Sequence, residues 1–407
     1  MTEHTDKLSS RASLRDDPPV ALAKRAIKLL EAKIRQEFDL ELPLGVELEF
    51  GVLSNQRQHK ASPAEQYGVP DALGKISNHT ASAYRHPKNR DAWFPESRRV
   101  AYSYREESND DRWDMMEVVL THEPRGQDGT RLPIDALATA RAVEALRHQL
   151  HQPSSGYMPR KHGAGIPTAQ LGVRYWQQQR RDTIDMLVTE AVVPGTFNSH
   201  GMHLNMSLVD ASTQENVMLR SGLSAETVTN MLRQGIGAVQ MENLWLVCPH
   251  RRSMERQSMR MGPISDVMGR VKNKRGQKDY VENSLPGADC NPYYAIMLQL
   301  AGTYLALKEA QFGYDYTTQQ HVLGNPDYAQ DLKAPQPGEK QVNALTLNDL
   351  QANFRAGSHL RDALDACEPG LGDAFHHAIE QTPPGYEKSG MDKLQKTRRT
   401  LAPQRDR

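Results

Sequence analysis

Two glutamates, Glu47 and Glu49, stand two residues apart in the stretch Gly45-Val46-Glu47-Leu48-Glu49-Phe50. Apolar and charged residues alternate there, which predicts a β-strand with both carboxylates on one face, roughly 6–7 Å apart. Inside a cavity such a pair forms a hard-oxygen site that suits Mg²⁺ or Mn²⁺. On an exposed face the same pair has no function, so the spacing alone leaves both interpretations open.

A third carboxylate, Glu117, lies in the stretch Trp113–Val119, where the flanking apolar residues predict a buried strand. A carboxylate buried without a partner is costly, so Glu117 needs one. The partner is either an arginine or a metal ion.

The stretch Asn198–Leu208 carries a denser set of polar groups. Alternation places His203, Asn205 and Ser207 on one face of a strand, opposite apolar residues, and Gly201 allows a close backbone approach. A lone histidine is more often structural. Three polar side chains in a row instead favour a pocket for a nucleotide and a metal ion.

The last group lies in Tyr280–Tyr293, which predicts a strand carrying Glu282, a tight turn, and a helix that begins at Asn291-Pro292. Asp, Asn and Pro also favour caps and turns for purely structural reasons. This stretch alone therefore fits either a site or a simple turn.

Helices and strands must bring these segments together, and the coarse class is α+β with antiparallel strands and a helical C-terminal third. Helical spacing of apolar residues predicts eight helices, at Val20–Phe38, Leu132–His151, Thr168–Thr189, Ala225–Cys248, Asn291–Phe312, Thr346–Ala356, Leu360–Ala366 and Leu371–Gln381. Strands are predicted at Gly45–Val52, Trp113–His122, Gly201–Val209 and Asp279–Glu282. Loops are expected over 53–112, with room for one short strand pair, and over 251–278 and 313–343.

Composition excludes several classes of function. The 407 residues are 38% hydrophobic, with 50 basic and 50 acidic side chains, so the chain can bury a core and has no net charge to attract nucleic acid or an anionic membrane. No apolar run approaches the ~18–20 residues that span a bilayer, and the polar N-terminus lacks a signal sequence. Cys248, Cys290 and Cys367 are too far apart for a zinc site. We expect a reduced, cytoplasmic, soluble protein.

Four segments, in this order, resemble the catalytic domain of the glutamine synthetase superfamily. They are Gly45–Phe50, Met115–Val119, Gly201–Leu208 and the E-N-x-L-P-G-A-D-x-N-P-Y segment Glu282–Tyr293. The resemblance covers roughly residues 44–380. It implies a catalytic domain over 19–385, in which a curved antiparallel sheet lines the active site and helices pack outside, and it allows a homo-oligomer. Residues 1–18 are then a flexible leader and 386–407 a basic tail.

The resemblance also implies roles for individual residues. Glu47, His203 and Glu282 would hold the metal that grips the ATP phosphates, and Glu49 and Glu117 a second metal. A further acidic ligand would come from Glu106, Glu107, Asp110, Asp111 or Asp114. Ser207 and Asn205 match nucleotide-contacting positions, and Asn198 a substrate-contacting one. Arg256 resembles the arginine that binds the substrate carboxylate, and Lys274 or Arg275 the one near the transferred phosphate.

The chain departs from the family pattern at three residues. Ser284 and Tyr280 stand where arginines are usual, and Asn205 replaces the second histidine of an HxH pair. Only residues 1–43 precede the first acidic strand, too few for the N-terminal β-grasp domain of ordinary glutamine synthetases, although glutamate–cysteine ligases also lack it.

The implied activity is that of an ATP-dependent carboxylate–amine ligase. It would act through an acyl phosphate on glutamate or a related amino acid, with Mg²⁺ or Mn²⁺ and an amine other than ammonia. The alternative is a catalytically impaired relative that binds ATP as a regulator.

Overall fold

The structure is a computed structural model, and it describes residues 18–54, 100–109, 113–122, 134–151, 184–188, 201–220, 223–248, 268–270, 280–287, 290–330 and 345–382. The helices are α2 (Pro18–Phe38), α6 (Ala136–His151), α8 (Val217–Arg220), α9 (Ala225–Glu242), α10 (Leu244–Val247), α13 (Pro292–Glu309), α14 (Leu347–Ala356), α15 (His359–Cys367) and α16 (Leu371–Gln381). The strands are β1 (Leu40–Glu41), β2 (Leu44–Ser54), β3 (Val100–Asn109), β4 (Trp113–His122), β5 (Ile184–Val188), β6 (Met202–Met206), β7 (Val209–Asp210), β8 (Met268–Arg270), β9 (Val281–Asn283), β10 (Phe312–Asp315) and β11 (Gln320–Leu323).

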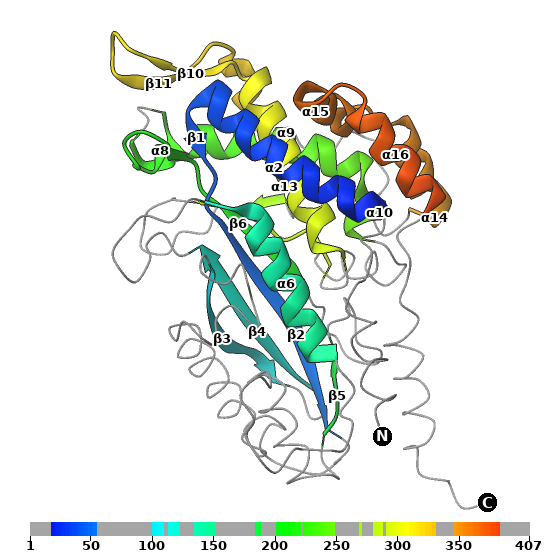
Figure 1. Ribbon diagram of the computed structural model, residues 1–407. Coiled ribbons are helices and arrows are strands. Elements are labelled where there is room, and N and C mark those ends of the chain that lie inside the picture. Colours follow the sequence, from blue (N-terminus) through cyan, green and yellow to red (C-terminus); the bar gives the residue numbers. More distant parts are fainter. Residues whose placement is uncertain are drawn as a thin grey trace, which may run out of the picture.

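The fold is α+β, and its main sheet is antiparallel. Its strand order is β3-β4-β2-β6-β9-β8, with β5 also paired to β2. Strand β2 lies at its centre, because β4 pairs along one edge while β6 and β5 share the other. In Figure 1 most helices gather beyond one end of this sheet.

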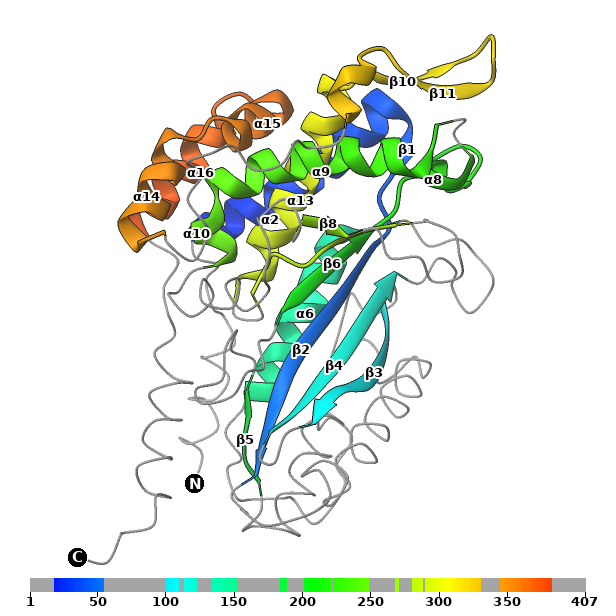
Figure 2. The same ribbon diagram turned by 180° about the vertical axis from the view of Figure 1, so that it is seen from behind.

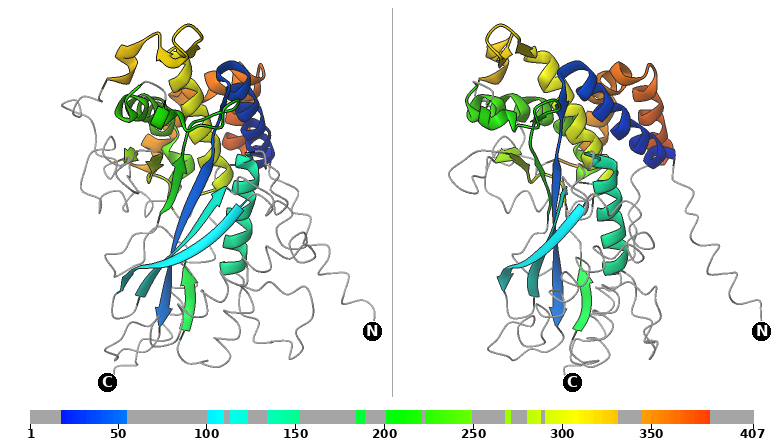
Figure 3. Two further views of the ribbon diagram at one scale, coloured as in Figure 1. Left: turned by 90° about the vertical axis from the view of Figure 1, so that its left-hand side faces the viewer. Right: turned by 60° about the vertical axis from the view of Figure 1, so that its left-hand side comes forward.

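Helix α6 covers one face of the sheet, as Figure 2 and the side views of Figure 3 show. Val46 and Leu48 of β2 are fully buried in the same core as Leu137 and Val143 of α6. Because side chains alternate along a strand, Glu47 lies on the opposite face of β2. The carboxylate of interest therefore faces away from α6.

Helix α13 is the central helix of the layer beyond the sheet. The side chain of Asn291 caps it by accepting the Tyr293 N–H at 2.9 Å, and Pro292 occupies its first turn. All its residues from Pro292 to Leu307 are buried. It crosses α9 so closely that a Cβ on Gly235 would lie 2.3 Å from the Gly302 carbonyl oxygen.

Several sequence predictions were wrong. For the stretch 53–112 we expected long loops with room for one short strand pair; β3, which pairs with β4 from Val100 to Asn109, is longer than that. Strand β5 occupies the end of the helix predicted over Thr168–Thr189, whose residues 168–183 lie outside the described part. An apolar run as short as Ile184–Val188 fits a strand or a helix equally well, and pairing with β2 decides it.

Two further segments hold more regular structure than we expected. Strand β8 lies within 251–278, and the stretch 313–343 contains the hairpin β10–β11 and a 3-10 turn at Pro326–Ala329. The helix predicted over Ala225–Cys248 breaks at Asn243, whose side-chain amide donates to the Val239 carbonyl at 2.7 Å. Helix α2 begins at Pro18, inside the predicted leader. Among the described helices, none is long and apolar enough to cross a bilayer.

Candidate metal centre

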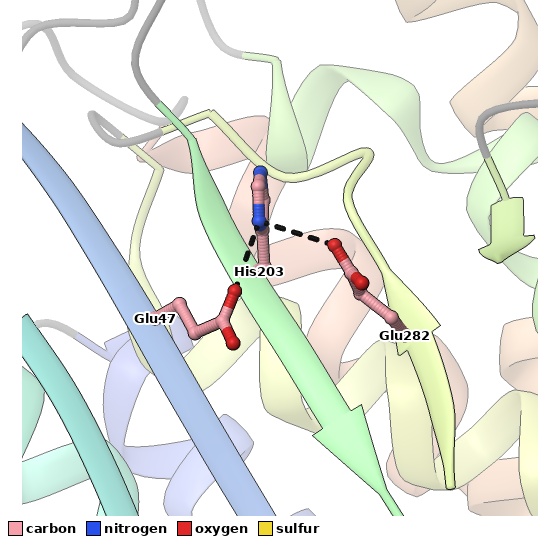
Figure 4. Close-up of side chains that lie close together, drawn as sticks. All are labelled: Glu47, His203 and Glu282. Carbon is pink, nitrogen blue, oxygen red and sulfur yellow. Dashed lines mark hydrogen bonds and ion pairs between the residues drawn. The ribbon is translucent and has the colours of Figure 1, made fainter. Parts of the chain in front are cut away.

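Three neighbouring strands bring Glu47, His203 and Glu282 together. Glu47 on β2 pairs directly with His203 on β6, and Asn205, two residues further along β6, pairs with Glu282 on β9. Figure 4 shows the three side chains pointing toward one another. The register of a regular antiparallel sheet is therefore enough to assemble the group.

The geometry of the group is tight. His203 Nδ1 lies 3.3 Å from Glu47 Oε2 and 3.3 Å from Glu282 Oε1. One potential ligand atom from each residue lies within 4.8 Å of the other two. Glu47, His203 and Glu282 are only 6%, 5% and 2% exposed.

Two carboxylates so close together in a buried place are costly unless positive charge compensates them. A divalent cation bound among the three side chains would supply such a charge. Asn205 adds an oxygen, because its buried Oδ1 has no hydrogen-bond partner among the described residues. Carboxylate and amide oxygens with one imidazole fit a divalent cation such as Mg²⁺ or Mn²⁺.

The predicted second metal group is defined at the level of backbone register. Glu49 on β2 pairs directly with Glu117 on β4, and Glu117 pairs on its other side with Arg105 on β3. Like charges directly opposite one another on a sheet destabilise it. The sequence left an arginine or a metal ion as the partner of Glu117. Arg105 occupies a strand position at which it could be that arginine.

The candidates for the further acidic ligand are separated by the same register. Glu106 pairs with Met116 and Asp114 with Asn109, whereas Glu107 is the extra residue of an irregularity in β3 between Glu106 and Ser108. Asp110 and Asp111 lie outside the described residues.

The other predicted site residues divide into two groups. Ser207 follows β6 directly, is partly exposed, and donates its backbone N–H to the Pro43 carbonyl. Four lie outside the described residues: Asn198, Arg256, Lys274 and Arg275. At the two positions where arginines were expected, Ser284 is 2% exposed and Tyr280 is partly exposed.

The sequence analysis missed Arg270. It lies on β8 and pairs across the sheet with Glu282, beyond the irregularity between Met268 and Arg270. A strand of three residues has no usable periodicity. The only signal was the apolar-flanked run Val267-Met268-Gly269-Arg270-Val271 within a basic stretch.

Comparison with solved structures identifies the fold. The chain is similar to GmaS in complex with ADP, with a TM-score of 0.50 and 17% identity over 94% of this chain and 77% of that one. It is also similar to GmaS without ligand (TM-score 0.49, 17% identity, 93% and 76% covered) and to a novel glutamine synthase homolog (0.48, 14%, 93% and 75%). No protein-family model and no curated protein matches the chain. The fold is glutamine-synthetase-like, as the motifs led us to expect.

Proposed function

We propose that this chain is an ATP-dependent carboxylate–amine ligase. The observation that carries the proposal is the buried group Glu47–His203–Glu282, built by three adjacent strands of a glutamine-synthetase-like fold. The complex of GmaS with ADP is a nucleotide-bound protein of similar fold.

Glu47, His203 and Glu282 would hold one Mg²⁺ or Mn²⁺ ion, and Glu49 and Glu117 a second. When bound, such ions neutralise charge on the nucleotide phosphates during phosphoryl transfer. The residues themselves supply position. Their strands fix the carboxylates before any ligand arrives, so little reorganisation is needed at the moment of reaction.

The proposed reaction has two steps. A carboxylate oxygen of the substrate attacks the γ-phosphorus of ATP, ADP leaves, and an acyl phosphate forms. The amine nitrogen then attacks the acyl carbon, phosphate leaves, and the amine loses a proton. Ser207 and Asn205 would contact the nucleotide, Asn198 and Arg256 the carboxylate substrate, and Arg256 and Arg275 the reacting groups.

Ser284 bears on the substrate. An arginine forms paired hydrogen bonds with a carboxylate or a phosphate, and a buried serine cannot replace them. We therefore propose glutamate or a related amino acid as the carboxylate donor, and an amine larger than ammonia as acceptor.

The test is ADP release from Mg²⁺- or Mn²⁺-ATP, with a panel of carboxylates crossed against amines. ADP release that requires one pair, and falls at least a thousandfold in Glu282→Ala, supports the proposal; each tenfold is about 1.4 kcal/mol of barrier. Unaltered turnover in Glu282→Ala contradicts it. Metal-dependent ATP binding without turnover on any pair favours the regulator instead.

A further inference from the structure

Behind the metal centre, on the far face of β9, lies a buried pair of amides. Asn283 follows Glu282 directly and, like Gln299 on α13, is fully buried. The Asn283 Nδ2 donates to Gln299 Oε1 at 2.7 Å. The surrounding positions of this interface, Val281, Leu204 and Met206 among them, are apolar.

The orientation of both amides is fixed by their neighbours. Asn283 Oδ1 accepts the backbone N–H of Leu285 at 3.1 Å, so its Nδ2 must face Gln299. Gln299 therefore presents Oε1 to Asn283 and turns Nε2 toward Met206 Sδ, 3.9 Å away on β6. One side chain of α13 thus contacts both strands that carry His203 and Glu282.

Strand β9 needs such an anchor because it is short. It has three residues, and its register with β6 rests on three pairs, from Leu204↔Asn283 to Met206↔Val281. A slip of one residue would turn Glu282 into the core and Asn283 toward the metal centre. A directional hydrogen bond in an apolar surrounding opposes that slip, since the slipped state leaves two buried amides unpaired.

The Asn283 side chain also contacts the turn that follows β9, through the backbone N–H of Leu285. In this turn the Pro286 carbonyl accepts the Met202 N–H at 3.0 Å, and Gly287 forms a β-bridge with Gly201. Met202 immediately precedes His203. The Asn283 side chain is thereby linked to the strand positions of two of the three members of the metal centre.

We propose that Asn283 and Gln299 are positioning residues, whose hydrogen bond fixes the register of β9 and so the place of the Glu282 carboxylate. This inference rests on the metal centre of the proposed function. It predicts that breaking the bond weakens cation binding by more than its effect on folding accounts for.

The test measures Mn²⁺ affinity from the electron paramagnetic resonance signal of free Mn²⁺, well below the melting temperature of each variant. We expect Gln299→Met to weaken Mn²⁺ binding about tenfold, the size typical of partners behind a metal ligand. Asn283→Ser keeps an acceptor for the Leu285 N–H but cannot reach Gln299, so we expect it to weaken Mn²⁺ binding to a similar extent. It replaces Gln299→Met in the test if that variant does not fold. The matched control is Gln240→Met, because Gln240 on α9 is equally buried and its amide has no hydrogen-bond partner among the described residues.

The outcomes separate the two proposals. Unaltered Mn²⁺ affinity in folded Gln299→Met or Asn283→Ser, or an equal loss in Gln240→Met, overturns the positioning role alone. Selective loss of Mn²⁺ affinity without ligase turnover in the wild-type chain supports the positioning role and defeats the ligase. A wild-type chain that binds no Mn²⁺ overturns this inference.

Discussion

Asn205 on β6 and Glu282 on β9 occupy directly opposite positions in the sheet, and the buried Oδ1 of Asn205 has no hydrogen-bond partner among the described residues. By strand alternation Asn205 shares a face of β6 with His203. Its neutral amide oxygen could serve as a ligand to a cation without adding negative charge to the two carboxylates.

Replacing Asn205 by aspartate is expected to have opposite effects on the stability of the metal-free protein and on its affinity for Mn²⁺. Asn205→Asp adds a third negative charge to a buried group, so the melting temperature in EDTA should fall. Because ligand charge tunes cation affinity, Mn²⁺ should bind about tenfold more tightly. Melting curves with EDTA and with saturating Mn²⁺ test both effects, and Asn205→Leu is the control, expected to weaken Mn²⁺ binding without an EDTA-specific loss. Equal melting shifts in both media would contradict the prediction.

Glu282→Gln should have the opposite effects on the stability in EDTA and on Mn²⁺ binding. It removes one of two crowded carboxylates, so the EDTA-treated protein should keep or gain stability while stabilisation by Mn²⁺ disappears. A cation at a hundred times its Kd stabilises by about 2.7 kcal/mol, which is the loss to look for. Glu41 is the matched control, since it is also buried (6% exposed) yet pairs with Arg35 at 2.9 Å. Glu41→Gln should lower stability and leave the Mn²⁺ response intact; loss of that response there would argue against a cation at Glu282.

Local patterns predicted the elements whose own residues determine them. The alternation around Glu47 and His203 predicted β2 and β6, and the Asn291-Pro292 cap predicted the start of α13. Since neighbouring strands hold the predicted Glu47, His203 and Glu282 in register, the group assembles from correct local predictions.

Elements fixed by distant partners were not predictable in this way. The polar strand β3 owes its conformation to pairing with Asp114–His122 of β4 rather than to its own propensity. The apolar run of β5 becomes a strand because β2 offers a free edge there. Arg270 escaped notice for the same reason, because only its pairing with Glu282 distinguishes it from the other basic residues around it.

The position of Arg270 predicts a role in nucleotide binding. An arginine at the strand position opposite Glu282 would bring a positive charge to phosphates bound at the proposed metal centre. A charge-assisted hydrogen bond is worth roughly 1.5–3 kcal/mol. Arg270→Ala should therefore weaken Mg²⁺–ADP binding about tenfold or more in calorimetry, with Arg270→Lys recovering part of it. Arg355→Ala, which removes an exposed ion pair with Glu380 on the helical layer, is the control and should leave ADP binding unchanged. Identical ADP affinity in Arg270→Ala would remove Arg270 from the site.

The contact between α9 and α13 predicts a sharp difference between two glycines. A Cβ on Gly235 would meet the Gly302 carbonyl oxygen at 2.3 Å, whereas a Cβ on Gly313 in β10 meets nothing within 4 Å. Gly235→Ala must push the helices apart and should cost about 2–3 kcal/mol or more of unfolding free energy. Gly313→Ala should change it by less than about 0.5 kcal/mol. Urea titrations give both values, and similar costs for the two would show that the helices do not cross as closely as described.

The free energy of unfolding should also fall at acidic pH, because His376 is buried. This histidine is stacked on Phe354 with ring centroids 4.2 Å apart, and its Nε2 has no hydrogen-bond partner among the described residues. Burial, with a smaller contribution from the nearby Arg361 charge, lowers the pKa of His376 from 6.5 to about 4. The folded state therefore binds fewer protons than the unfolded one between these values. The stability that the neutral ring contributes is complete above pH 6.5 and is lost as the pH falls toward 4, by at most about 3 kcal/mol.

His376→Phe isolates this contribution, because it keeps the stack on Phe354 and removes the titrating group. The unfolding free energy of the variant relative to wild type should rise progressively as the pH falls from 6.5 to 4, since groups far from His376 contribute equally in both proteins and cancel. The exposed neighbour His377 provides a control for the substitution itself, because His377→Phe adds the same ring to α16 without touching the stack on Phe354. A flat difference for His376→Phe would mean that its ring takes up a proton in the folded state as easily as in the unfolded one, and so that it is not buried against Phe354.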